Sequence, residues 1–128
     1  MSETRIKEVG TVIVPVSDQD RAIEFYTDKL GFEVRTDSAY GDGDRWVEVA
    51  PAGAATTIAL VPPREGQSVG VPTNMGLSTE DVDADHASLK ERGADVDDVM
   101  RMGDPVPPMF FLRDQDGNSA LVVQRAED

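Results

Sequence analysis

The sequence predicts a single α+β domain over residues 1–128, built from two βαβββ modules. In the run 11–34, TVIVPVSDQDRAIEFYTDKLGFEV, a β-branched strand, an amphipathic helix, a glycine and a second strand follow one another. A weaker copy of the same order starts roughly 63 residues later. We therefore expect modules at approximately residues 6–61 and 73–125, separated by the Pro- and Gly-rich linker 62–72.

The first module should begin with a strand at Val12–Val16, whose β-branched side chains suit a buried strand. Ser17 is expected to cap the following helix with its side-chain oxygen, because acidic residues then fall in the first turn. Gly31 provides the left-handed end of this helix. One helical face is apolar and should pack on a sheet; it carries Ala22, Ile23, Tyr26 and Leu30.

The remaining elements follow from alternation and turn composition. A second helix should start at Asp81 or Asp83 and end at Gly93. The sequence DQDG at 114–117 predicts a hairpin turn, and the loop 100–108, MRMGDPVPP, is suited to cover the mouth of a cavity. The other strands are expected at 32–35, 45–50, 56–61, 74–79, 96–100, 109–112 and 119–124.

Composition excludes several classes of partner. Twenty-five acidic and twelve basic residues give a formal charge of −13, which repels nucleic acid and anionic membrane surfaces. No apolar run is long enough for a membrane span, and the segment MSETRIKEVG lacks the apolar core of a secretory signal. The chain contains no cysteine, so disulfides and thiolate metal sites are excluded. We expect a cytoplasmic protein.

The segments VPVSDQDRAIEFYTDKLGFEV and FFLRDQDGNSALVVQ resemble the vicinal oxygen chelate superfamily, which contains glyoxalases, bleomycin-resistance proteins and extradiol dioxygenases. The resemblance covers nearly the whole chain, and its motifs are specific for a fold rather than for a reaction. It implies curled mixed sheets that form a cup, often in a homodimer, with a ligand or a divalent metal inside.

In members of that superfamily that use a metal, the ligands lie on the inner faces of the first and last strands of each module. Matching the turns of this chain to the family pattern places those positions at Thr11, Ala59, Asn74 and Leu121. None is a histidine or a carboxylate, and the one histidine, His86, falls on a predicted helix. The expectation is a cup without the usual metal and without a cofactor.

Strand alternation selects the side chains that share the inner face, because residues two apart point to the same side. Val47 and Val49 would then pack under the helix. The result is an apolar small-molecule cavity with a few polar groups. Its expected ligand-binding residues are Thr11, Ile13, Trp46, Glu48, Thr57, Ala59, Asn74, Ser78, Met102, Met109 and Leu121.

Glu48 is the candidate catalytic residue. A carboxylate in a partly apolar cup should have a raised pKa, which suits a general acid or base, or a counter-ion for a cationic ligand. Alternatively, Glu48 lies in solvent at a sheet edge or pairs with an arginine. Trp46 either stacks on a planar or cationic ligand or completes the core, and the methionines of the loop either form an adaptable lid or fill gaps.

Three functions stay open at this point. The first is metal-independent binding of a small organic molecule of cationic or aromatic character; the acidic surface would attract a cationic one. The second is an isomerase, lyase or dioxygenase-type enzyme of the same fold that uses Glu48 or unrecognised metal ligands. The third is a regulatory or structural dimer with a vestigial cup. We expect a small-molecule ligand and a homodimer, with no nucleic acid or membrane partner.

Overall fold

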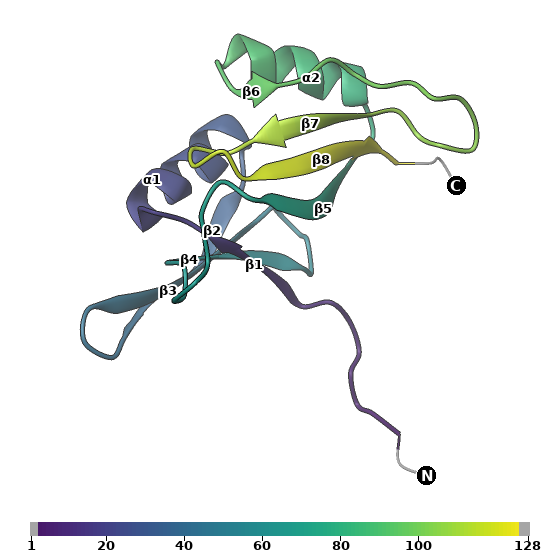
Figure 1. Cartoon of the computed structure of the whole chain (residues 1–128). Helices are drawn as coiled ribbons and strands as arrows, with labels where there is room; N and C mark the ends of the chain where they lie inside the picture. Colours follow the sequence, from purple (N-terminus) through teal and green to yellow (C-terminus); the bar gives the residue numbers. More distant parts are fainter. Residues whose placement is uncertain (1–2, 126–128) are drawn as a thin grey trace.

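Two four-stranded mixed sheets form the chain (Figure 1). The computed structural model describes residues 3–125. The first sheet has the order β1-β4-β3-β2, and its strands are β1 (Thr11–Pro15), β2 (Glu33–Tyr40), β3 (Asp44–Ala50) and β4 (Thr57–Val61). The second has the order β5-β8-β7-β6, with β5 (Pro72–Thr79), β6 (Asp95–Val96), β7 (Met109–Arg113) and β8 (Ser119–Gln124). In both sheets the first and last strands of the module are parallel and the other pairs are antiparallel. The predicted α+β class and the two βαβββ modules are confirmed.

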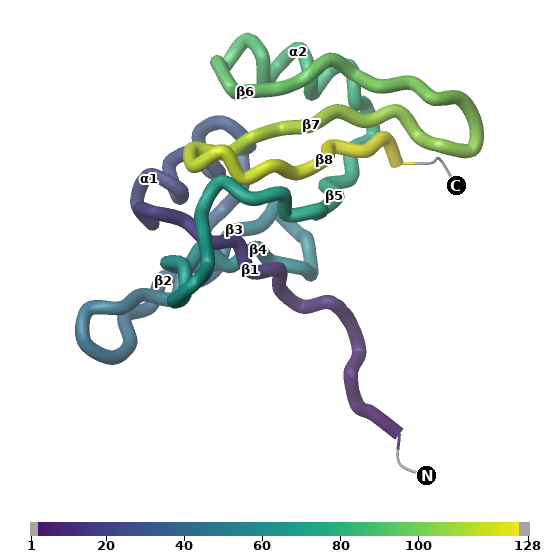
Figure 2. Tube along the Cα trace, viewed as in Figure 1, coloured from purple at the N-terminus to yellow at the C-terminus, as the bar shows by residue number. Residues whose placement is uncertain are grey.

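One helical segment belongs to each module: α1 (Gln19–Glu24) with its continuation η1 (Phe25–Lys29), and α2 (Val82–Glu91). Figure 1 shows α2 lying along the second sheet, and Figure 2 shows the same path of the chain as a tube. Asp18 and Asp81 cap the two helices by accepting hydrogen bonds from N–H groups of the first turns. No helix within residues 3–125 is long and apolar enough to cross a membrane.

The prediction that Ser17 caps the first helix is wrong. Asp18 has the extended backbone of a capping residue and accepts from Asp20 N at 3.0 Å and Arg21 N at 3.2 Å. Ser17 precedes the capping position by one residue. Its hydroxyl and its backbone N–H instead donate to Asp116 of the other module.

The second half of the first helix differs from the expected α-helix, because Phe25–Lys29 winds as a π-helix. A π-helical turn holds more residues than an α-helical turn, so the apolar face is spread around the axis. Tyr26 consequently packs in the core of the first module, while Phe25 and Leu30 also reach the core of the second.

Two predicted strands have different lengths in the structure. The second strand runs to Tyr40 rather than ending near residue 35, because it pairs along the whole of β3. The strand expected at 96–100 is reduced to Asp95–Val96, followed by an isolated bridge between Met100 and Met109.

The two modules share one continuous apolar region on the helix-covered sides of their sheets. The core of the first module is formed by Val14, Val16, Ala22, Tyr26, Val47, Val49, Ile58 and Leu60. The core of the second is formed by Val82, Leu89, Phe110, Leu112 and Val122. Leu30 and Leu77 pack against both cores. The modules therefore meet through their helix-covered sides, and the opposite faces of both sheets point away from this contact.

A buried hydrogen-bond network at the β7–β8 turn holds the modules together. Asn118 donates from Nδ2 to Pro15 O and to Asp114 Oδ2, each at 2.9 Å, and its Oδ1 accepts from Gly70 N at 2.8 Å. Tyr26 donates its hydroxyl to Asp114 Oδ2 at 3.1 Å. Burial and the adjacent Asp114 carboxylate raise the pKa of Tyr26, so its phenol remains a donor.

The contact between Ser17 and Asp116 extends this network to the surface. Burial has the largest single effect and would raise the pKa of Asp116, but the hydrogen bonds from Ser17 and Gln115, together with the charge of Arg21, hold the pKa below its usual value. The predicted DQDG turn is present, with Gly117 at φ 83°. We call the whole set the inter-module clasp; it consists of Pro15, Ser17, Tyr26, Asp114, Asp116 and Asn118.

Removal of the Asn118 side chain should destabilise the whole fold. Asn118 is 3% exposed, and Asn118→Ala leaves buried backbone and carboxylate partners unsatisfied. We expect a loss of about 3 kcal/mol in the free energy of unfolding, measured by urea denaturation. Ser38→Ala, at an exposed position of β2, is the control and should change this free energy by less than about 0.5 kcal/mol. A loss below about 1 kcal/mol in Asn118→Ala would contradict a structural role for the clasp.

Candidate ligand-binding site

The outward side of the first sheet carries most of the polar groups that strand alternation selected. Thr11 of β1 lies opposite Thr57 of β4, and Glu48 of β3 lies opposite Ala59. Val47 and Val49 are fully buried on the helix-covered side, as the alternation predicts. We call this surface the first-sheet face; it contains Thr11, Ile13, Trp46, Glu48, Thr57 and Ala59.

Glu48 is the centre of a hydrogen-bond network on this face. Trp46 donates from Nε1 to Glu48 Oε2 at 2.5 Å, and Thr57 donates its hydroxyl to Glu48 Oε1. The hydroxyls of Thr57 and Thr11 are 2.9 Å apart. Because the single proton of Thr57 points to the carboxylate, Thr11 is the donor in this second contact. Two donors thus hold the Glu48 carboxylate in one orientation.

The expected raised pKa of Glu48 is wrong. The hydrogen bonds from Thr57 and Trp46 stabilise the charged form and lower the pKa of Glu48, and they outweigh the opposing effect of burial. Glu48 forms no ion pair with an arginine or lysine among residues 3–125. It is therefore an ionised, oriented carboxylate without a protein counter-ion in the described part of the chain.

The outward side of the second sheet is mainly apolar. Gly76 lies opposite Leu121, and Ser78 lies opposite Val123. Met109 and Phe111 of β7 pair with these same positions of β8. We call this surface the second-sheet face; it contains Gly76, Ser78, Met109, Phe111, Leu121 and Val123. Phe111 was not among the predicted site residues, although the alternation that selected Met109 also places Phe111 there.

Two predicted site residues stand apart from the regular strand surface. Asn74 has a positive φ of 58° and lies where the register between β5 and β8 shifts. Its side chain is exposed. Met102 lies in the loop before β7 and is 59% exposed.

Comparison with known proteins identifies the family. Residues 8–121 match the Glyoxalase/Bleomycin resistance protein/Dioxygenase superfamily. The chain belongs to this superfamily. TnmS3, an antibiotic binding protein from Streptomyces sp. CB03234, is 37% identical, with a TM-score of 0.87 over 97% of this chain and 100% of that chain. A superfamily member from Sphaerobacter thermophilus DSM 20745 is 33% identical, with a TM-score of 0.88 over 95% of this chain and all of its own. The protein YetH of Bacillus subtilis (strain 168) is 32% identical over 93% of this chain and 99% of its length.

The positions matched to the metal ligands of the glyoxalase superfamily do not provide a suitable donor set here. Thr11 and Asn74 are both exposed, and Ala59 and Leu121 have no donor atom. Within residues 3–125 no group of three or more His, Cys, Asp or Glu side chains is arranged to hold a metal ion. His86 is half-buried, packs edge-on against Phe110 with ring centroids 5.1 Å apart, and bonds through Nε2 to Asp97 O at 2.9 Å.

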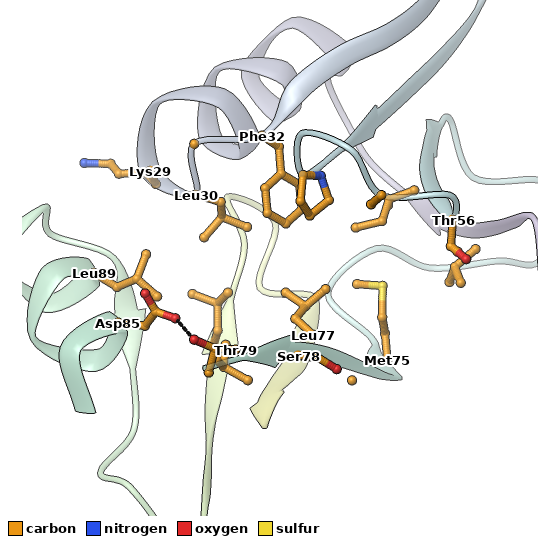
Figure 3. A pocket seen from close by; sticks show the side chains of 18 of the residues that line it. Lys29, Leu30, Phe32, Thr56, Met75, Leu77, Ser78, Thr79, Asp85 and Leu89 are labelled. Carbon is orange, nitrogen blue, oxygen red and sulfur yellow. Dashed lines mark hydrogen bonds between the residues drawn. The ribbon is translucent and has the colours of Figure 1, made fainter. Parts of the chain in front are cut away.

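Within residues 3–125 the two outward faces point away from the contact between the modules. A cleft of about 1100 Å³ instead lies between the modules on the helix-covered side, as Figure 3 shows. Of the predicted site residues, only Thr57 and Ser78 line this cleft. Most of its walls were not predicted as site residues, because Ile58 and Leu77 point to the side of their strands opposite the predicted site residues Thr57 and Ser78.

Acidification should protonate Glu48 only at low pH. Because the pKa of Glu48 is lowered, its carboxylate stays ionised to a lower pH than that of an ordinary glutamate. The ionised carboxylate and its hydrogen bond to the indole are lost only as the pH falls through the folded-state pKa. The emission of Trp46, the only tryptophan, should stay constant from neutral pH to about pH 5 and change below about pH 4.3. Glu48→Gln should remove this transition. If the emission of Trp46 changed with a midpoint above about pH 5, the pKa of Glu48 would be raised rather than lowered.

Proposed function

We propose that the protein binds a small organic cation with an aromatic part at the first-sheet face, without a metal and without turnover. The observation that carries this proposal is the ionised Glu48, held by Trp46 and Thr57. A buried or half-buried carboxylate is normally paired, and no cationic side chain within residues 3–125 forms an ion pair with this one. A ligand cation would supply the missing charge.

The surroundings of Glu48 suit such a ligand. The Trp46 ring is only partly exposed beside the carboxylate, where a cation or a planar group gains from its π face. Ile13 adds an apolar surface that is 44% exposed. The formal charge of −13 attracts cations from a distance. The similarity to TnmS3, an antibiotic binding protein, supports a binding role for a small molecule.

The lowered pKa of Glu48 favours binding over acid–base catalysis. A general acid must be protonated at the working pH, and an efficient general base has a pKa near that pH. Glu48 satisfies neither condition, because its hydrogen bonds move its pKa downward. For the same face we propose metal-independent action, supported by the lack of donor atoms in Ala59 and Leu121. The cytoplasmic location expected from the sequence stays a prediction.

Ligand titration followed by the fluorescence of Trp46 tests the binding role. Benzamidine and larger cationic aromatic antibiotics should bind more tightly than uncharged counterparts such as benzamide, because only the cations pair with Glu48. Glu48→Gln keeps the shape of the side chain and should weaken cation binding by about tenfold.

The matched control for this test is Glu24→Gln, at an exposed position of α1, which should leave the affinity unchanged. A chelator should have no effect on binding. The proposal fails if no cation changes the signal of Trp46, if Glu48→Gln binds as tightly as the wild type, or if the chelator abolishes binding.

We also propose that the protein forms a homodimer in which the first-sheet face of one copy meets the second-sheet face of the other. The modules of one chain pack through their helix-covered sides, so neither outward face is closed by its own chain. Both faces carry apolar side chains, including Ile13 and Leu121. Closing them against each other would bury these residues and place Glu48 in a cavity.

Sedimentation velocity should therefore report a dimer. Ile13→Arg places a charge in the proposed interface and should shift the protein to the monomer and weaken ligand binding, while the urea midpoint stays close to the wild type. Ala87→Arg, at an exposed position of α2, is the control and should remain dimeric. A wild-type monomer at all accessible concentrations, or a dimeric Ile13→Arg variant, would exclude this arrangement.

A further inference from the structure

The cleft between the modules is separate from the site around Glu48. It lies on the helix-covered side of β4 and β5, whereas Glu48 and Trp46 project from the opposite side of the first sheet. Its volume of about 1100 Å³ exceeds the small voids of packed protein interiors. It is slightly above the usual size of small-molecule sites, about 300–1,000 Å³, and is therefore large enough for such a ligand.

The walls of the cleft are mainly apolar and come from both modules. Leu30 and Phe32 follow the first helix, and Met75 and Leu77 of β5 face them across the space in Figure 3. Leu89 of α2 closes one end. Ile58, Leu112 and Val122 also line the cleft and are at least 95% buried. An apolar molecule that enters would therefore exchange water for a continuous hydrocarbon surface.

Positive charge gathers at the edge of the cleft in a strongly acidic protein. Three of the twelve basic residues line it, namely Lys29, Arg92 and Arg125. Lys29 donates from Nζ to Arg92 O, and Arg92 donates from Nη1 to Lys29 O at 2.9 Å. Neither Lys29 nor Arg92 forms an ion pair with a carboxylate in the described chain, residues 3–125. Both keep further N–H donors beyond these bonds.

One carboxylate, Asp85, also lines the cleft, but the Thr79 hydroxyl donates to it. The basic residues outnumber it, and Lys29 and Arg92 hold each other in place across the boundary between the modules. The charge of the lining is thus opposite in sign to the charge of the whole protein.

We propose that this cleft is a second ligand site, for an apolar molecule with one anionic group, such as an aromatic sulfonate or a long-chain carboxylate. The apolar body lies between Phe32 and Leu77, and the anionic group pairs with Lys29 and Arg92. The proposal does not depend on the function proposed for the first-sheet face. Of the residues that line the cleft, Thr57 is shared with that face, and the proposed ligand contacts do not involve it.

Two probes that share one aromatic skeleton test the charge preference. Anilinonaphthalene sulfonate is anionic, and phenylnaphthylamine lacks the sulfonate; both fluoresce when they leave water. The sulfonate should bind at one saturable site, and the double variant Lys29→Gln/Arg92→Gln should weaken it by roughly fivefold or more while leaving the neutral probe unchanged. Lys90→Gln, at an exposed position of α2 outside the lining, is the charge control and should bind both probes like the wild type.

A steric variant locates the probes. Ser88 is half-buried on α2 and lines the cleft, so Ser88→Phe should fill the space and block both probes. Glu48→Gln should leave both affinities unchanged, which separates this test from the ligand titration at the first-sheet face. Equal urea midpoints would show that the variants fold like the wild type.

The proposal is overturned if the wild type binds no probe, or if Ser88→Phe binds both probes unchanged. It is also overturned if loss of Glu48 removes binding, which would place the probes at the first-sheet face. If no probe binds and the Ser88→Phe variant has a lower sedimentation coefficient than the wild type, a second copy of the chain covers the cleft instead.

Discussion

The hydrogen bonds of Asn118 and Asp114 determine how the two modules meet. Asn118 lies in the β7–β8 turn of the second module, yet it bonds to the backbone of β1 and to the linker that joins the modules. Tyr26 adds a contact from the first helix to the same turn. Because these groups are buried and mutually satisfied, separating the modules would expose unpaired polar atoms. This constraint keeps the helix-covered sides together and turns the other faces of both sheets outward.

The two outward faces have become chemically different although both modules follow one plan. The first-sheet face carries an ionised carboxylate with an indole and two hydroxyls, whereas the second-sheet face offers Leu121, Val123 and Phe111. A ligand enclosed between such faces would have its charged group fixed on one side and its apolar surface covered on the other. The proposed dimer would place the polar groups of the first-sheet face opposite the mainly apolar second-sheet face.

Local patterns in the sequence predicted the elements and the face of each strand, since alternation and helix caps depend on near neighbours. They placed Glu48 and Thr57 on one face, with Val47 on the opposite side of its strand, as the structure shows. They failed where the deciding partner is distant in sequence: Ser17 bonds to a residue 99 positions away. The pKa of Glu48 was misjudged for a related reason, because composition indicates an apolar cup but not the two donors that reach the carboxylate. No local sequence pattern predicted the cleft between the modules, because residues from both modules line it.

Strand β4 forms a wall of both proposed sites, and this fixes which substitutions can distinguish them. Adjacent residues of a strand point to opposite sides, so Thr57 bonds to Glu48 while Ile58 lines the cleft. Thr57 also borders the cleft, so a change there would disturb both surfaces. Glu48 and Ser88 each belong to one surface only. Substitutions of Glu48 and Ser88 would therefore distinguish cation binding at the first-sheet face from anion binding in the cleft. If a ligand at one site changed the affinity of the other, the coupling would pass through β4, which the two sites share.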